Sequence, residues 1–438
     1  MKHYIAILSA VFLGGAMNLT AGGATNSSTI YDSDPKHLWN RLNEALFQRT
    51  ASDGKHYGLD ELDILYWQQS THLLDEPSHQ QALAALDEFI RVHGEKMIHD
   101  PFKHALLQRD LWQLFDWVAA PWPDHHFATQ REELENRLAV VIRRLALTTN
   151  EIAALPDNYA LTKTTQTPDL PAGLFETNGD WVCLGPNGFQ EIAPIHDHSF
   201  GGRSVFLAFV RFPQGRQAAL NYLLQLRIFE HPWIYVTNTW PFDTTNSPRE
   251  VLDINPHLPQ FPTNTEWALA RRMLTIDASG ELRPTPIIES IQLRHYLGFF
   301  RADSAESTHR NGFPPQKFFE FDLDRRHGGV LREIAPDESD FLFVHFFSKG
   351  FDPFGSDVGR SSTEDSSRLK RGVLDDCRTC HSSSGIYSVN VATRQFQQQD
   401  TQPLRLLPVD AADVNAVINW KREQFAWGML QGLWNQFR

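Results

Sequence analysis

A change in hydrophobic periodicity near residue 160 is the feature that most constrains the fold of this chain. Between about Pro35 and Leu155, apolar residues recur every three or four positions, as they do on the buried face of a helix. Further along, short runs rich in aromatic and β-branched residues are bounded by Gly, Pro and Asp, which is typical of strands. The sequence therefore predicts a helical part followed by a part that contains a sheet.

Several helix starts are expected in the first part. Pro35 is predicted at a first helical position, and Asp100 followed by a proline predicts an N-cap with proline at the first helical residue. Thr129, with a glutamate three residues later, predicts a capping box, and Ser78 predicts the cap of another helix. Residues 25–160 are therefore expected to form a helical domain of about four or five helices.

The second part is expected to contain the sheet. The strand-like runs are 204–212, 233–239, 287–296, 317–323 and 341–347, with a helical pattern at 214–229. We expect residues 171–349 to form a central domain with an antiparallel or mixed sheet. A Gly-, Ser- and Asp-rich boundary precedes residues 363–438, which are predicted to form a small helical domain ending in a helix over 411–437. The predicted fold class is α+β with several domains.

The N-terminus and the net charge indicate where such a chain acts. Residues 1–24 have the pattern of a secretory signal, with a polar start, an apolar run at 5–16 and small residues up to Ala24. We expect a periplasmic or secreted protein with no transmembrane segment beyond this signal. The net charge is −13 without a Lys/Arg-rich stretch, which argues against a nucleic-acid partner because phosphate binding needs clustered positive charge.

The three cysteines carry most of the chemical information. So few cysteines in an exported chain of 438 residues exclude a disulfide framework. Cys183 lies in an apolar, strand-like run and is predicted to be buried. Cys377 and Cys380 are three residues apart and His381 follows directly. On a helix these side chains share one side, so two thiols and one imidazole are presented together.

The run Cys377-Arg378-Thr379-Cys380-His381 resembles the C-x-x-C-H attachment motif of c-type cytochromes. The resemblance implies one covalent haem c, with thioethers at Cys377 and Cys380 and His381 as the proximal iron ligand. It further implies electron transfer with a redox partner protein, and a cytochrome c-like fold for residues 363–438. It covers the five motif residues and the helix expected before them, and it says nothing about the rest of the chain.

The second axial ligand is less well defined by the sequence. Met429 is the only methionine after the motif, but it lies in a helical stretch where a methionine commonly fills the core. His295 and His345, in strand-like runs, are alternatives. An iron with an open position would instead favour an oxidoreductase that acts on a small molecule, or one that uses the haem as an electron port.

Other interpretations of the same residues stay open. Cys377 and Cys380 form a redox dithiol or a disulfide if no haem is attached, although a low thiol pKa usually requires a helix N-terminus. A zinc site on the same residues lacks a second ligand pair. His196 and His198 are two apart and would face one side of a strand, where they could chelate a second metal, but a polar loop is the simpler interpretation.

Overall fold

The structure is a computed structural model of the 438-residue chain. It describes residues 29–50, 56–59, 71–121, 126–163, 167–185, 193, 196, 200–238, 249–299, 316–335, 374, 381, 385–389, 407–409 and 414–436. Cys377, Cys380, His198, the predicted strand at 341–347 with His345, and the predicted signal at 1–24 lie outside these residues.

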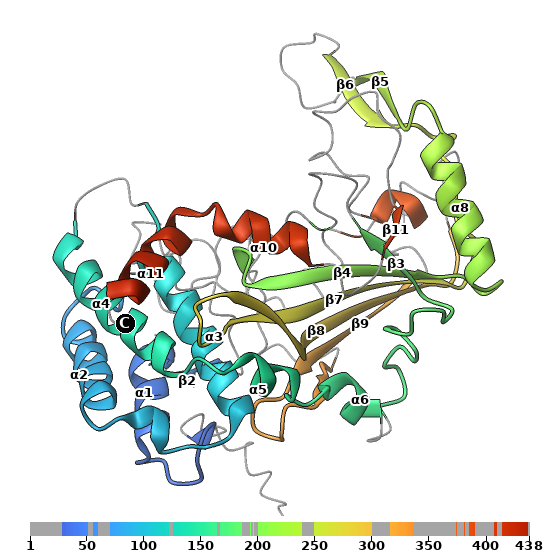
Figure 1. Ribbon diagram of the computed structural model, residues 1–438. Coiled ribbons are helices and arrows are strands. Elements are labelled where there is room, and N and C mark those ends of the chain that lie inside the picture. Colours follow the sequence, from blue (N-terminus) through green and yellow to red (C-terminus); the bar gives the residue numbers. More distant parts are fainter. Residues whose placement is uncertain are drawn as a thin grey trace, which may run out of the picture.

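The first part of the chain folds into helices, as the periodicity predicts. They are α1 (Leu38–Phe47), α2 (Ser78–Arg91), the 3-10 turn η3 (Gly94–Lys96), α3 (Pro101–Val118), α4 (Ala128–Arg144), α5 (Thr149–Ala153) and α6 (Asn158–Lys163). A short ladder, β1 (Arg49–Thr50) with β2 (His56–Tyr57), accompanies them. Helix α3 is buried along almost its whole length, because α4 contacts it and the sheet strand β7 runs beside it (Figure 1).

The start of α3 confirms the cap that the sequence predicts. The Asp100 carboxylate accepts a hydrogen bond from the Phe102 amide at 2.9 Å, and Pro101 is the first helical residue. The predicted capping box at Thr129 is wrong, because α4 already begins at Ala128 and Thr129 therefore lies inside its first turn.

Two other predicted helix starts also need correction. Ser78 is the first residue of α2 rather than its cap. Helix α1 begins at Leu38 behind a His37 cap, so Pro35 lies before the helix and not within it. The structure has a capping box elsewhere, at Thr148, whose side chain and backbone pair with Glu151 at the start of α5.

A seven-stranded sheet forms the centre of the described structure, and all of its neighbouring strands are antiparallel. In spatial order its strands are β10 (Leu331–Glu333), β9 (Gln316–Leu323), β8 (Leu282–Tyr296), β7 (Thr265–Ile276), β4 (Ser204–Arg211), β3 (Val182–Gly185) and β11 (Leu407–Pro408). The prediction of a fold that mixes helices with an antiparallel sheet is therefore confirmed.

The two faces of this sheet pack against different partners. One face, here called the helix face, contributes Cys183, Leu207, Leu293 and Phe321 to the main core with the helices. Cys183 is buried in β3, as predicted. The other face, here called the pocket face, carries a second apolar cluster of strand side chains and residues near the C-terminal 3-10 turn η6 (Gly385–Ser388). This separation decides which parts of the chain can meet at a site.

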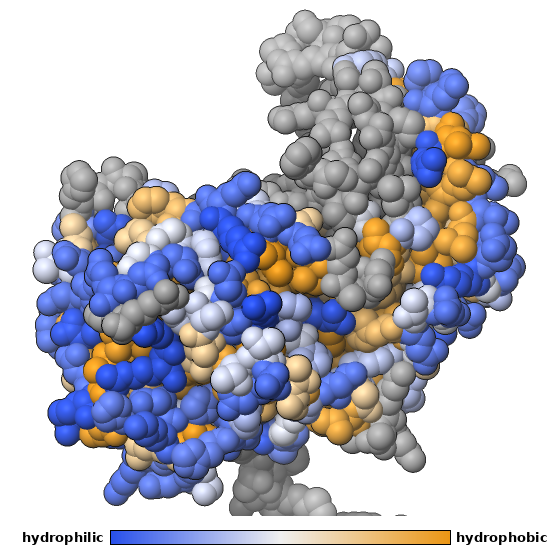
Figure 2. Space-filling model, viewed as in Figure 1, coloured by the Kyte–Doolittle hydropathy of each residue, from blue (hydrophilic) through white to orange (hydrophobic). Residues whose placement is uncertain are grey.

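A helix and a hairpin extend from one end of the sheet. Helix α8 (Arg216–Ile228) follows β4, and the ladder of β5 (Trp233–Asn238) with β6 (Arg249–Ile254) follows α8 (Figure 1). Ala219, Leu223 and Leu226 of α8 are buried in the pocket-face cluster. Leu224 and Ile228 are exposed, and apolar surface is visible along this helix in Figure 2.

The C-terminal chain forms two helices rather than the one predicted over 411–437. Helix α10 (Asn415–Arg422) ends at a break around Glu423, and α11 (Phe425–Gln436) then packs against α4 and α3. Trp427, Leu430 and Trp434 of α11 are buried in the main core. The C-terminus thus lies among the N-terminal helices (Figure 1).

Candidate functional site

The motif histidine lies on the pocket face of the sheet in a segment held by distant side chains. The Gln316 amide of β9 donates to the His381 carbonyl at 2.7 Å. The Gln260 side chain, in the connection before β7, accepts a hydrogen bond from the Ile386 amide at 2.8 Å. The sheet and its connections therefore hold both His381 and the η6 turn that contains Ile386.

Ser388 is the central attachment point of this segment. Its hydroxyl pairs with the Tyr296 hydroxyl of β8 at 2.6 Å, and its carbonyl accepts a hydrogen bond from Arg294 Nη1 at 2.8 Å. Tyr296 is fully buried. A buried hydroxyl pair and a charge-assisted bond hold the Ser388 carbonyl in one orientation.

The same carbonyl orients the imidazole of His381. Its Nδ1 lies 2.7 Å from the Ser388 oxygen and 2.9 Å from Arg294 Nη1. The two contacts favour opposite tautomers, because the Ser388 carbonyl requires a proton on Nδ1 and Arg294 Nη1 requires a lone pair there. We assign the ring proton to Nδ1, since Arg294 Nη1 already donates to the Ser388 carbonyl at 2.8 Å and the contact to that carbonyl is the shorter one for the imidazole. In this tautomer Nε2 carries the lone pair that binds metals.

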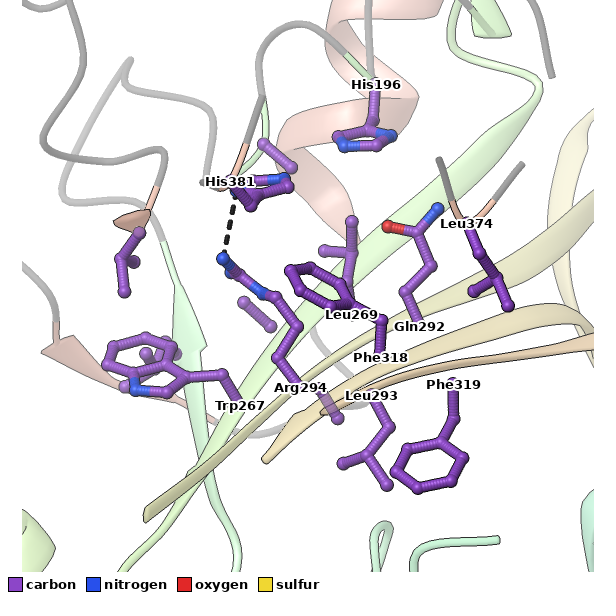
Figure 3. Close-up of a pocket in the computed structure, with 15 residues that line it drawn as sticks. His196, Trp267, Leu269, Gln292, Leu293, Arg294, Phe318, Phe319, Leu374 and His381 are labelled. Carbon is purple, nitrogen blue, oxygen red and sulfur yellow. Dashed lines mark hydrogen bonds between the residues drawn. The ribbon is translucent and has the colours of Figure 1, made fainter. Parts of the chain in front are cut away.

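A pocket that is partly open to solvent lies beside His381 (Figure 3). Its lining is mostly apolar, and its polar members are His196, Gln292, Arg294 and His381. The remaining lining residues are Leu184, Ala193, Ala208, Trp267, Ala268, Leu269, Leu293, Phe318, Phe319, Leu374 and Val389. A concave apolar site with a few placed polar groups is the usual form of a cofactor or ligand site.

His196 is the second imidazole of this pocket. It is buried, with 8% of its surface exposed, and its ring lies 5.4 Å from that of Phe206 on the pocket face of β4. Figure 3 shows both imidazoles on the same side of the sheet, above Arg294 and Gln292. The ring of His196 is therefore enclosed and not exposed to solvent.

A buried carboxyl group adjoins the wall of the pocket. Gln292 shares a hydrogen bond with Glu320, its cross-strand neighbour on β9. Burial, together with the nearby Asp322 carboxylate, raises the pKa of Glu320 well above its ordinary value. Glu320 is therefore protonated at a pH where an exposed glutamate is charged.

The arrangement around His381 fits the haem ligand that the motif implies. A metal-binding histidine usually donates its other ring nitrogen to a carbonyl or carboxylate, which fixes the tautomer and the ring orientation. His381 makes this bond to Ser388, and an apolar pocket lies beside it. Cys377 and Cys380 lie outside the described residues, so His381 is the part of the motif to which this test applies.

The structure does not bring Met429 together with His381. Met429 packs against the main core on the helix-face side, whereas His381 lies on the pocket face. His295 stands on β8 one position from Arg294, so its side chain leaves the opposite face of the strand. The described parts of residues 363–438 thus contact two separate regions of the molecule.

Sequence reasoning missed the residues that hold the motif histidine. Arg294, Gln260, Gln316 and Ser388 belong to no recognisable motif, and the first three are 65 to 126 positions away from their partners. The sole local signal is the strand pattern of β8, whose alternation puts Arg294 and Tyr296 on one face.

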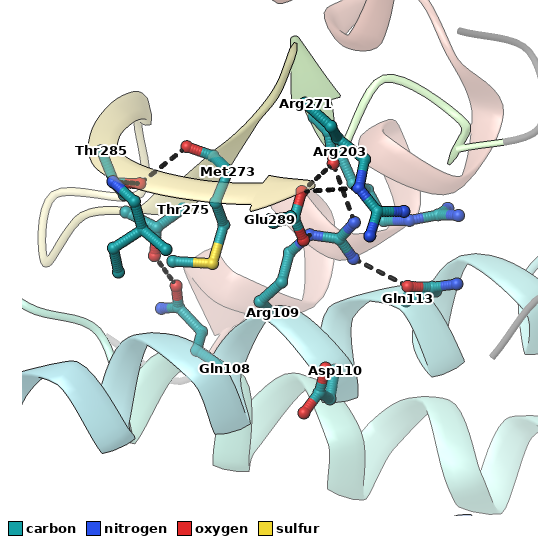
Figure 4. A network of polar contacts seen from close by, with 12 residues as sticks. Gln108, Arg109, Asp110, Gln113, Arg203, Arg271, Met273, Thr275, Thr285 and Glu289 are labelled. Atoms are coloured by element: carbon teal, nitrogen blue, oxygen red, sulfur yellow. Dashed lines mark hydrogen bonds and ion pairs between the residues drawn. The ribbon is translucent and has the colours of Figure 1, made fainter. Parts of the chain in front are cut away.

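A second set of buried polar groups lies between α3 and the sheet (Figure 4). Arg109 is 3.4 Å from the Glu289 carboxylate and donates to Ser204 Oγ at 3.0 Å, while Ser204 donates to Glu289 at 2.5 Å. Burial lowers the pKa of Arg109 to about 10, although Glu289 opposes this shift. None of these residues lines the pocket beside His381, and we assign them to the packing of α3 on the sheet.

Comparison of the chain with known proteins gives no match. No protein-family model matches the chain, and neither the curated proteins nor the solved structures give a match. Within the described ranges, no group of three or more His, Cys, Asp or Glu side chains is arranged to hold a metal ion. No helix of those ranges has the length and apolarity needed to cross a membrane.

Proposed function

We propose that this chain is an exported electron-transfer protein that carries one haem c on Cys377, Cys380 and His381. The bound haem would supply an iron that alternates between the ferrous and ferric states. The chain's own residues orient the proximal imidazole, surround it with apolar side chains and keep bulk water away. Residues 363–438 are the haem-bearing part in this proposal.

The 2.7 Å contact between His381 Nδ1 and the Ser388 carbonyl, beside an apolar pocket, is the observation that carries the proposal. Structural histidines make the same kind of contact, as His79 Nδ1 does with the Leu73 carbonyl at 2.9 Å, so the adjoining pocket is what distinguishes His381. Here Ser388 is held in turn by Arg294 and Tyr296, so the lone pair on Nε2 has a defined direction. Cys380 directly precedes His381 in the sequence, which links this geometry to the attachment motif.

The lining of the pocket favours electron transfer over chemistry on a substrate. Apart from its two imidazoles, of which His381 is the proposed iron ligand, its described members include no carboxylate, lysine, thiol or hydroxyl that could act as an acid, base or nucleophile. Arg294 is bound to the segment that it holds, and Gln292 is bound to Glu320. Exclusion of reactive groups is what an electron carrier requires of its haem pocket.

Location and partner follow from the same proposal. The pattern of residues 1–24 supports export, and haem attachment to a C-x-x-C-H motif suits a compartment outside the cytoplasm. The net charge of −13 supports a redox partner with a basic docking surface, because opposite charges steer such encounters.

The experiment is a haem-stained denaturing gel with a pyridine haemochrome spectrum, on protein exported from a host that matures c-type cytochromes. We expect a c-type spectrum, and stain that stays on the protein band. Replacing both Cys377 and Cys380 with alanine should remove the stain. Cys183→Ala is the matched control and should keep it, because Cys183 is buried on the helix face of β3.

A colourless protein from that host would disprove the haem proposal. Thiol titration and metal analysis of the same sample would then decide between a Cys377–Cys380 disulfide or dithiol and a zinc site. Stain that survives the double replacement would show that the haem is held elsewhere.

A further inference from the structure

We propose that His196 is the second axial ligand of the haem, on the side of the iron opposite to His381. This inference rests on the proposed function. It replaces the assignment of Met429, which the sequence favours by position alone. It links a residue between β3 and β4 to a motif near the C-terminus.

His196 lies in the same pocket as His381. His196 and His381 line one pocket, and their rings lie on the same side of the sheet (Figure 3). Most of what surrounds them is apolar, as the environment of a porphyrin must be. Met429 packs into the core on the other side of the sheet, and the β8 alternation directs the His295 side chain to the helix face. Of the described candidates, His196 is the one that shares the pocket.

The side chains of the described lining also limit which ligands the iron could take. A haem iron takes imidazole, thioether, thiolate or phenolate ligands from proteins. The described lining contains no methionine, cysteine or tyrosine, and it contains two imidazoles. Arg294 cannot lose a proton to become a ligand, and the side chain of Gln292 is bound to Glu320. Among the described lining residues, the donors suited to a haem iron are therefore two histidines.

The ring of His196 is also held in place by its neighbours. The ring of His196 is buried and contacts Phe206 at a centroid distance of 5.4 Å and an interplanar angle of 41°. Phe206 itself lies 5.4 Å from the ring of Phe200. An imidazole that is buried against an aromatic ring has less freedom to rotate and less contact with water than an exposed one, before any metal binds. Both losses would otherwise reduce its affinity as a ligand.

Two imidazole ligands would determine the behaviour of the iron. With both histidines bound, the iron would be six-coordinate and low-spin without an open position, which would suit electron transfer and exclude binding of a substrate at the iron. They also give a lower reduction potential than a histidine–methionine pair, because a methionine ligand raises the potential. The identity of the two iron ligands would thus distinguish an electron carrier from an oxidoreductase that binds its substrate at the iron.

The test begins with the wild-type holoprotein. Near-infrared magnetic circular dichroism of the ferric form distinguishes histidine–histidine from histidine–methionine coordination, and we expect the former. The variant His196→Leu should keep the haem stain, because attachment depends on Cys377 and Cys380. It should lose the low-spin spectrum, and added imidazole should restore that spectrum by taking the vacated position.

His295→Leu is the matched control and should keep the low-spin spectrum, because that histidine faces away from the pocket. A wild type with histidine–methionine coordination or a five-coordinate iron would overturn the assignment, as would a low-spin His196→Leu without added imidazole. If His196→Leu does not fold, His196→Met tests the same position, because it should change the coordination from histidine–histidine to histidine–methionine. A wild type without haem stain would overturn the proposed function as well, so the two failures are distinguishable.

Discussion

Asp116→Asn should destabilise the protein strongly, because it leaves two buried cations without their carboxylate. The Asp116 carboxylate lies 2.6 Å from Arg203 Nη1 and 2.5 Å from Lys421 Nζ. All three side chains are buried, and they join α3, the start of β4 and α10. Removing one partner of a buried ion pair typically costs about 3–5 kcal/mol.

The lysine's share of this cost can be worked out from its pKa. Burial lowers the pKa of Lys421 to about 8, although the charge of Asp116 opposes this shift and Arg203 adds to it. Without Asp116 the pKa of Lys421 falls further, and the lysine releases its proton and becomes neutral instead of remaining a buried, unpaired charge. At pH 7 this release costs about 1.4 kcal/mol, because pH 7 lies about one unit below the pKa of about 8. Arg203 cannot release its proton in this way, so its buried and unpaired charge accounts for the rest of the loss in stability.

The pH dependence of this penalty follows with a definite sign. The folded pKa of Lys421 lies below the unfolded value of 10.5, so the folded state releases its proton first and wild-type stability rises between about pH 8 and 10.5. At pH 9 the lysine is mostly neutral in both wild type and Asp116→Asn. The difference in unfolding free energy between them should therefore be about 1.4 kcal/mol smaller at about pH 9 than at about pH 7.

Urea unfolding followed by circular dichroism at the two pH values measures this difference. In a Lys421→Met background, Asp116→Asn should cost the same at both, because the group that titrates is gone. Lys421→Met alone should cost less than Asp116→Asn, since Asp116 keeps Arg203. A penalty for Asp116→Asn that is independent of pH in the wild-type background would refute the reasoning.

Three further outcomes are expected. Burial, together with the nearby Asp322 carboxylate, raises the pKa of Glu320, so the folded state holds a proton that the unfolded state releases. Wild-type stability should therefore fall by up to about 1.4 kcal/mol per pH unit above pH 4.5, and Glu320→Gln should lack this loss in urea titrations at successive pH values. Arg294→Met should cost about 1.5–3 kcal/mol in thermal unfolding, because the Ser388 carbonyl loses its charged donor. Gly385→Ala should lower the midpoint of thermal unfolding, because Gly385 has a φ of +57° and an added methyl group would collide with the glutamine that holds the segment; an unchanged midpoint would contradict this.

The elements that the sequence predicts correctly are those whose pattern is local. Helix α3 has its cap, its proline and its apolar spacing within one stretch of chain, and α8 and β4 are equally self-contained. Strand β7 is not predicted, because Arg271 and Arg272 interrupt its apolar pattern. Arg271 lies 3.7 Å from Glu289 on the neighbouring strand, so the sheet supplies a partner that no local pattern reveals.

Strand β8 shows a second limit of local reasoning. The residue pattern predicts a start at residue 287, whereas the strand begins at Leu282. Pro284 and Pro286 argue against a strand, because proline cannot donate to a ladder. The ladder with β7 has register shifts in this region, and such irregularities accommodate proline inside a sheet.

The candidate site shows the same division between local and distant information. The spacing of Cys377, Cys380 and His381 points to one chemistry, because that chemistry needs its groups within two turns of one helix. What orients His381 is the Ser388 carbonyl, and what holds Ser388 is the alternation of β8, which puts Arg294 and Tyr296 on one face. These contacts arise only when the sheet has formed, so the sequence predicts a ligand but not the pocket in which it is presented.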